Sequence, residues 1–371
     1  MPQLDGVRGI AILMVVACQY FHFADIPAIQ IHPLVRLAAL GWTGVDLFFV
    51  LSGFLLGGLL LDHKGHPHYY RRFYLRRVGR ILPLYYVWLL FCAIAGLGRA
   101  APYYLVFAQN WAMAIWDIPT PALLFISWPL CIEEQFYLVV PVLVSRLSRK
   151  NLCRAAVAFL AAAPLLRAAA RHIIPLHNAS LFVLPVTHGD GLALGVLLAA
   201  ALRSEQARRW YAQHRRGILA AAAGLACWSA SGLLQIKAAD FAGRSPFFTP
   251  IALAAGALVL ESVAAPAGAV ARICRVAPLR FFGKISYCLY LVHWPILQFV
   301  ANWVMGNHDL VIHSYQGMLR MVELCSISAL GIAVGICWLS YRYFEQPILR
   351  CAAVYAGRTT SEVSLTPNAQ A

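Results

Sequence analysis

Two arginines one helical turn apart are the first residues in this sequence whose types and spacing could do chemistry. Arg77 and Arg80 are three positions apart, so on a helix both side chains can point in the same direction. Guanidinium groups are suited to binding phosphate through paired hydrogen bonds. Arg8, at the edge of an earlier apolar stretch, could add a third contact or could be a snorkelling anchor. From charge alone, Arg77 and Arg80 fit a site for a phosphate-bearing ligand and an ordinary basic loop equally well, since Arg71, Arg72 and Arg76 are close by.

Four ionisable residues within or beside apolar stretches are further candidates: Asp46, Glu133, Asp190 and His293. A charge within a membrane span is costly, so such residues usually face the bundle interior or a water-filled cavity and are candidates for function. Three of them also have a structural interpretation. Glu133 could be the partner of an intramembrane Arg or Tyr hydroxyl, Asp46 a packing hydrogen-bond centre, and His293 a core histidine.

Ten apolar stretches could hold these residues in membrane-spanning helices, each of which needs about 20 predominantly apolar residues. The predicted spans are 8–25, 42–61, 80–98, 124–145, 155–170, 180–202, 217–235, 247–264, 283–304 and 321–341. The stretch 102–116, with Asn110 and several aromatic residues, suits a re-entrant or interfacial segment better. The sequence therefore predicts an all-α polytopic membrane protein, a bundle of about ten transmembrane helices.

Positive charge supports this layout independently, because Lys and Arg accumulate in short cytoplasmic loops. With a cytoplasmic amino terminus, 23 of the 30 Lys and Arg residues fall on the inner side and 7 on the outer side, alternating loop by loop. Both termini are therefore predicted to be cytoplasmic, and the polar residues 351–371 to form a disordered cytoplasmic tail.

Composition excludes several other classes of protein. The chain is 61% hydrophobic and 12% charged, against about 45–50% apolar and 25% charged in soluble domains. In a soluble chain, the net charge of +15 would suggest binding to nucleic acid. Here the basic residues lie between apolar runs, as expected for residues that set membrane topology. The predicted partner is therefore the lipid bilayer and not nucleic acid. The 10 Cys show no metal-ligand spacing, and no Walker loop, GxGxxG or GxSxG motif occurs, so no metal site is predicted.

Seven short motifs, in a fixed order along most of the chain, carry a resemblance to a known family. They are LDGVRGIA at 4–11, GVDLFFVLSGFL at 44–55, FYLRRVGRILP at 73–83, SW at 127–128 with IEEQFYL at 132–138, GDGLALG at 189–195, GKISY at 283–287 with YLVHWP at 290–295, and YRYFEQP at 341–347. Together they resemble the acyltransferase 3 family, membrane enzymes that move acyl groups, often acetyl, onto carbohydrates and related acceptors. The resemblance implies an acyltransferase transmembrane domain over residues 1–350.

The same resemblance implies roles for individual residues. It places an acyl-coenzyme A site, with acetyl-coenzyme A as the default donor, at Arg8, Arg77 and Arg80 on the cytoplasmic side. The family's general base is a histidine eleven residues after the first-helix arginine, and here that position holds Gln19, which cannot accept a proton at neutral pH. His22 shares a helix face with Arg8 and Gln19, so we predict it as the base. The alternatives are an interfacial histidine without a chemical role and a bundle with altered or lost activity.

Glu133 opens the next predicted site element and could orient the base or bind the acceptor. Asp46, Asp190, His293 and Gln19 are predicted as substrate-binding or supporting residues. His188 stands where family members often have Arg, which leaves its contact with the acyl donor open.

The predicted function is transfer of an acyl group from acyl-coenzyme A to a hydroxyl of a carbohydrate or of a glycosylated or polyketide small molecule. The predicted location is the bacterial inner (plasma) membrane. A transporter or flippase of polar metabolites and a non-catalytic relative are the alternatives, since buried charges in a helical bundle also suit a translocation path.

Overall fold

Ten helices of twelve residues or more make up most of the part of the protein that the structure describes. The computed structural model describes residues 1–22, 33–94, 96–116, 118, 121–173, 180–236, 240–307 and 315–356, and within these ranges there is no strand. The long helices are α1 (Pro2–His22), α4 (Gly44–Asp62), α5 (Tyr69–Ala93), α9 (Trp128–Arg146), α10 (Arg149–Ile173), α13 (Asp190–Ala201), α14 (Glu205–Leu233), α16 (Phe248–Ala264), α18 (Ala277–Asn307) and α19 (Tyr315–Ser340). Short helices connect them: α3 (Pro33–Ala38), α6 (Ala101–Leu105), α7 (Gln109–Trp116), α8 (Ala122–Phe125), α11 (Ser180–Val183), α12 (Pro185–His188), α15 (Phe241–Arg244), α17 (Ala269–Cys274) and α20 (Gln346–Tyr355).

Six helical segments of the described ranges are long and apolar enough to cross a membrane, by length and composition. They are Pro2–Phe21, Pro33–Asp62, Leu123–Arg146, Arg149–Ala170, Ser245–Ala264 and Arg320–Tyr355, and each overlaps a predicted span. The all-helical membrane fold is thus confirmed. Three of the other four predicted spans fall on α5, α14 and α18, and each of these helices also carries charged residues. The fourth, 180–202, is interrupted between α11 and α13, and its apolar helix α13 is only twelve residues long.

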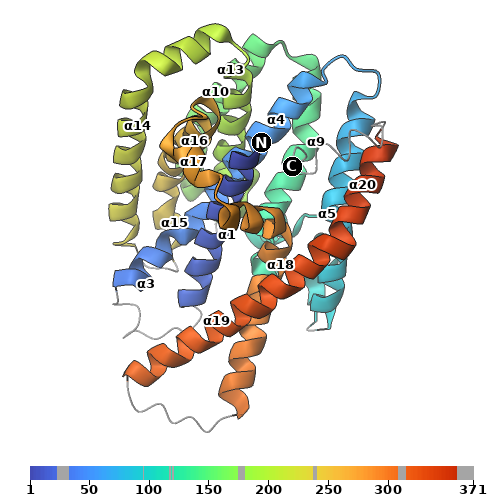
Figure 1. Cartoon of the computed structure of the whole chain (residues 1–371), viewed down its shortest axis with the longest axis vertical. Coiled ribbons are helices and arrows are strands. Elements are labelled where there is room, and N and C mark those ends of the chain that lie inside the picture. Colours follow the sequence, from blue (N-terminus) through green and yellow to red (C-terminus); the bar gives the residue numbers. More distant parts are fainter. Residues whose placement is uncertain are drawn as a thin grey trace.

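Helix α1 lies at the centre of the bundle, where α4, α16 and α18 contact it (Figure 1). Its small residues permit this position: a Cβ atom at Gly9 would collide with the carbonyl oxygen of Leu279 in α18. The pair α4 and α13 is equally close, since a Cβ atom at Gly53 would collide with the carbonyl oxygen of Leu192. Small side chains at such crossings let helix backbones approach in a membrane, where helices associate mainly by packing.

Tyrosine hydroxyls fix α5 between α9 and α18. Tyr69 donates a hydrogen bond to the carbonyl oxygen of Pro141 in α9 at 3.0 Å, and Tyr287 in α18 donates to that of Ile81 in α5 at 3.0 Å. At its far side α5 packs against α20, and Figure 1 shows this pair at one edge of the bundle and α14 at the opposite edge. This packing turns the arginines of α5 toward α1 and α9.

A π turn at Tyr341–Glu345 joins α19 to α20. Single π turns inside α-helices are rare and often occur at functional sites. Helix α20 continues to Tyr355, and 357–371 lie outside the described residues, so the disordered tail stays a prediction.

Candidate active site

A cavity of about 920 Å³ opens beside the amino-terminal end of α1. Helices α1, α4, α5 and α14 and the turn after α13 supply most of its wall. Seven arginines line it: Arg8, Arg76, Arg77, Arg80, Arg203, Arg208 and Arg215. Among the described residues of its wall, Asp5 and Asp62 are the acidic ones. We call this space the arginine cavity, and its excess of positive charge suits an anionic ligand.

A second space of about 100 Å³, the narrow pocket, shares three of these arginines. Arg8, Arg77 and Arg80 line both spaces, so they stand at the junction between them. The rest of the narrow pocket comes from α4, α9 and α18, with Ser52, Glu133, Tyr137, Ser286 and Tyr290 as its polar or aromatic groups. The structure therefore brings the three predicted arginines and Glu133 together in one place.

Glu133 is held by a directed chain of hydroxyl groups. The Tyr137 hydroxyl donates to Oε2 of Glu133 at 3.1 Å, and Ser52 Oγ lies 3.1 Å from the same hydroxyl oxygen. Since the one proton of Tyr137 goes to Glu133, the Ser52 hydroxyl must be the donor to Tyr137. The Arg77 guanidinium carbon lies 5.7 Å from the centre of the Tyr137 ring. A carboxylate, a phenol and a guanidinium thus converge on the narrow pocket.

The family-base position, Gln19, contacts a histidine from another helix. Nε2 of His293 in α18 lies 2.9 Å from Oε1 of Gln19, and Nδ1 of His293 lies 2.8 Å from the carbonyl oxygen of Leu289. The His293 side chain is fully buried. His22 is the last residue of α1, but its side chain lies outside the described residues, so its role as the base stays a prediction.

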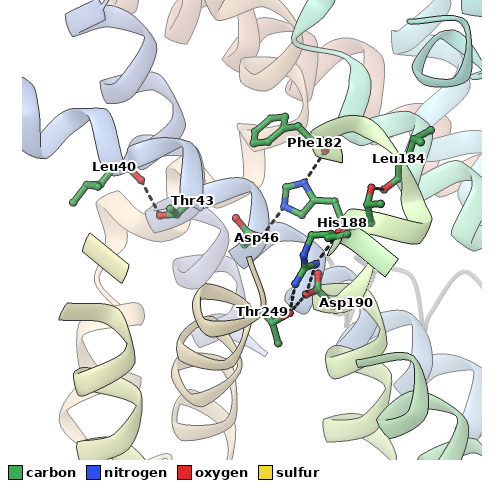
Figure 2. A network of polar contacts seen from close by, with 10 residues as sticks. Leu40, Thr43, Asp46, Phe182, Leu184, His188, Asp190 and Thr249 are labelled. Atoms are coloured by element: carbon green, nitrogen blue, oxygen red, sulfur yellow. Dashed lines mark hydrogen bonds and ion pairs between the residues drawn. The ribbon is translucent and has the colours of Figure 1, made fainter. Parts of the chain in front are cut away.

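Asp46 and Asp190 belong to a separate polar network, the buried ion-pair cluster. Figure 2 shows His188 between Asp46 and Phe182: Nε2 lies 3.0 Å from Oδ1 of Asp46, and Nδ1 lies 2.7 Å from the Phe182 carbonyl oxygen. Arg167 in α10 donates to Oδ2 of Asp190 at 3.2 Å. The cluster therefore ties α4, α10, α12 and α13 together.

Thr249 in α16 closes this cluster. Its hydroxyl donates to Oδ2 of Asp190 at 2.5 Å and accepts from Arg167 at 2.5 Å (Figure 2). Arg167 also donates to the Thr187 carbonyl oxygen at 2.7 Å. Every one of these bonds joins two different helices, so the predicted supporting residues Asp46 and Asp190 lie in a contact that holds the bundle together.

Several site residues were missed from the sequence. Arg203, Arg208 and Arg215 look like loop charges in the sequence, yet they line the arginine cavity. Tyr137 could have been found, because it follows Glu133 by four positions, one helical turn. Glu345 in the π turn is buried and accepts a hydrogen bond from Ser340 at 3.2 Å, and only its place in the last motif marks it.

Known proteins similar to this chain share one description. A family model described as an acyltransferase domain, that of the acyltransferase 3 family, matches residues 1–342. The chain is 24% identical to the peptidoglycan O-acetyltransferase OatA of Listeria monocytogenes, and the match covers 94% of this chain and 55% of that protein. It is 25% identical to the O-acetyltransferase OatA of Staphylococcus aureus, covering 94% and 57%. It is also 25% identical to the putative peptidoglycan O-acetyltransferase YrhL of Bacillus subtilis, and that match covers 94% of this chain and 54% of YrhL.

The chain thus spans little more than half the length of the curated relatives it matches. No solved structure matches it significantly. The bacterial relatives and the six apolar helices agree with the predicted bacterial membrane protein.

Proposed function

Because the chain belongs to the acyltransferase 3 family, we propose that it is a membrane O-acyltransferase that moves an acyl group, acetyl by default, from acyl-coenzyme A to a saccharide hydroxyl. One observation carries the proposal: the arginine cavity and the narrow pocket meet at Arg8, Arg77 and Arg80. A donor with phosphates at one end and a thioester at the other needs such a pair of spaces.

The arginine cavity would hold the phosphate-bearing end of the donor. Its volume of about 920 Å³ is within the roughly 300–1,000 Å³ of small-molecule and cofactor sites. Hydrogen bonds from arginine to phosphate are charge-assisted and stronger than neutral ones. The thin pantetheine arm would then pass the three shared arginines and bring the thioester into the narrow pocket.

In the transfer step, the acceptor hydroxyl oxygen attacks the thioester carbonyl carbon and the carbon–sulfur bond breaks. The proton of the hydroxyl must go to a base, and the thiolate of coenzyme A must gain a proton. Glu133 would hydrogen-bond the acceptor or orient the base, and the nearby Arg77 would stabilise the negative charge that develops on the carbonyl oxygen. Asp46 and Asp190 would act at a distance, by fixing α4 and α13.

The proposed topology has ten spans with both termini in the cytoplasm. It rests on the charge distribution, with 23 of 30 Lys and Arg residues on the inner side. In this orientation the amino-terminal end of α1 and the arginine cavity face the cytoplasm, where acyl-coenzyme A is made. The acceptor is proposed as a cell-wall saccharide, since two of the relatives are named for peptidoglycan.

Coenzyme A dependence tests the proposal. Purified full-length protein should be stabilised against thermal unfolding by coenzyme A, and it should release free thiol from acetyl-coenzyme A when a muramyl glycan is added. Arg80→Ala should raise the KM for the donor by roughly tenfold to a hundredfold, the value of one or two hydrogen bonds to a charged group. Arg71→Ala is the matched control, because Arg71 is on the same helix but exposed, and it should change the KM little.

A transporter would behave differently. Uptake of a polar solute by vesicles that contain the protein, with no stabilisation by coenzyme A and no thiol release, would contradict the proposal. Equal effects of Arg80→Ala and Arg71→Ala would contradict the assignment of the arginine cavity to the donor.

A further inference from the structure

Helices α1 and α18 bring two distant polar side chains together inside the bundle. Gln19 and His293 are 274 positions apart in the sequence, yet Oε1 of one and Nε2 of the other are 2.9 Å apart. The Tyr20 hydroxyl also donates to the His293 backbone carbonyl oxygen at 3.2 Å. The imidazole is therefore placed by α1 as well as by its own helix.

The neighbours of His293 determine which ring nitrogen can exchange a proton. The Leu289 carbonyl oxygen, 2.8 Å from Nδ1, can only accept, so Nδ1 carries a proton. In the neutral ring Nε2 then has the free electron pair and can act as a base. The contact at Nε2 is with Gln19, whose amide offers both an oxygen acceptor and an N–H donor.

A glutamine at this position can serve both protonation states of the histidine. With the amide oxygen toward Nε2, Gln19 accepts a hydrogen bond from the protonated ring. After a half turn of the amide, its N–H group donates to the neutral ring. A carboxylate would favour the protonated state and an apolar side chain would satisfy neither, so Gln19 suits an imidazole that gains and loses a proton.

His188 makes an instructive comparison, because it also lies beside the narrow pocket, against Phe49 at 5.6 Å between ring centres. Its Nδ1 faces a carbonyl oxygen, as in His293, but its Nε2 faces the carboxylate of Asp46. The contact at Nε2 of His188 is therefore with a carboxylate oxygen, 3.0 Å away. His293 has no such carboxylate among its described hydrogen-bond partners.

The narrow pocket and His293 are one helical turn apart. Tyr290 lines the pocket, and its ring centre lies 6.0 Å from that of His293. Gln19 follows Arg8 by eleven residues, about 16 Å along α1. Tyr290 therefore lies between the narrow pocket and His293, and α1 carries Arg8 at the pocket and Gln19 at the histidine.

We infer that His293 is the proton acceptor of the acyl transfer and that Gln19 holds its Nε2 in place until the acceptor hydroxyl arrives; this inference rests on the proposed function. The acceptor hydroxyl takes the place of the Gln19 amide at Nε2 and gives its proton to that nitrogen as its oxygen attacks the thioester carbonyl carbon. The tetrahedral intermediate collapses, the carbon–sulfur bond breaks, and Nε2 returns the proton to the departing thiolate. The products are the O-acyl ester and free coenzyme A, and the ring is neutral again.

The test replaces and then relocates the imidazole in the full-length protein. His293→Gln keeps a hydrogen-bonding amide of similar reach but cannot take up a proton, so kcat should fall by about a hundredfold or more, as for loss of a general base. The double variant Gln19→His with His293→Gln moves the imidazole across the contact and should regain part of the lost rate. A purely structural role predicts no such recovery.

Three controls make the result unambiguous. His22→Ala tests the base predicted from the sequence, and it should lower the rate less than His293→Gln does. His214→Gln changes an exposed histidine that lines neither the arginine cavity nor the narrow pocket, and it should transfer acyl groups at close to the wild-type rate. Stabilisation by coenzyme A should persist in every variant, which shows that fold and donor site are intact.

If the wild-type protein turns over and the rate of His293→Gln is within twofold of the wild-type rate, the inference is wrong but the proposed function stands. The same holds for a loss in His293→Gln that the relocated imidazole leaves unchanged, or for a loss confined to His22→Ala. An absence of acceptor-dependent thiol release from the wild-type protein would overturn both the inference and the proposed function.

Discussion

Arginines occur in two regions of this bundle with different neighbours. In the buried ion-pair cluster, Arg167 is 2% exposed, and its bonds to Asp190, Thr187 and Thr249 are all made within the protein. In the arginine cavity, seven arginines surround an open space with only two acidic residues among the described residues of the wall. Burial of a charge in a membrane span is therefore not enough to identify a ligand site. What distinguishes the two regions is the balance of charge around an open space: acidic partners face Arg8, Arg203 and Arg215, yet arginines outnumber the acidic residues of the described cavity wall.

The largest effect should come from breaking the matched pair. Asp190→Ala leaves the Arg167 guanidinium buried without its carboxylate, which should lower the free energy of unfolding by about 3–5 kcal/mol. Denaturation of the purified protein in detergent would measure it. Asp62→Ala is the control: its carboxylate is 60% exposed beside Arg203, so its loss should cost about 1 kcal/mol or less. Equal losses of unfolding free energy in the two variants would mean that the buried ion-pair cluster stabilises the fold no more than the exposed pair does.

A smaller effect, and on rate instead of stability, is expected at the narrow pocket. Glu133→Gln removes the charge but keeps an acceptor for the Tyr137 hydroxyl, so kcat should fall by about a hundredfold while thermal unfolding and coenzyme A binding stay unchanged. Acceptor-dependent thiol release measures kcat. Glu134→Gln, the next residue on the same helix, is the matched control and should keep most of the rate. A greater loss in Glu134→Gln would show that the wrong carboxylate has been placed in the site.

The smallest effect should come from a conservative change within the cluster. Asp46→Asn keeps an oxygen for Nε2 of His188 but removes the charge, so the free energy of unfolding should fall by about 1–2 kcal/mol. The transfer rate should remain near that of the wild type. A rate loss as large as that of Glu133→Gln, without a change in stability, would show that Asp46 acts in the reaction. The contrast between the two regions would then be wrong.

Apolar periodicity predicted the helical class, and the resemblance to a family implied that Arg8, Arg77, Arg80 and Glu133, from three different helices, belong to one site. The sequence did not predict which helices cross. The Gln19–His293 contact depends on how α1 passes α18, and the Arg167–Asp190 pair on how α10 meets α13. Such pairings are set by side-chain packing between helices far apart in the chain, for which single-helix patterns carry no signal. In the charge distribution along the sequence, Arg167 is one of the 7 outer-side residues, and nothing there indicates its pairing with Asp190.

The chain of hydroxyls from Ser52 to Glu133 also links two helices. With Glu133 ionised, Tyr137 donates to Glu133 and Ser52 donates to Tyr137. If Glu133 gains a proton and donates it, Tyr137 must become the acceptor, and its own proton must turn toward Ser52. Ser52 belongs to α4, whereas Tyr137 and Glu133 belong to α9. A proton gained by Glu133 would therefore reverse the direction of the hydrogen bond between Tyr137 and Ser52. The protonation state of Glu133 in α9 is thus coupled to the hydrogen bond that Ser52 makes from α4.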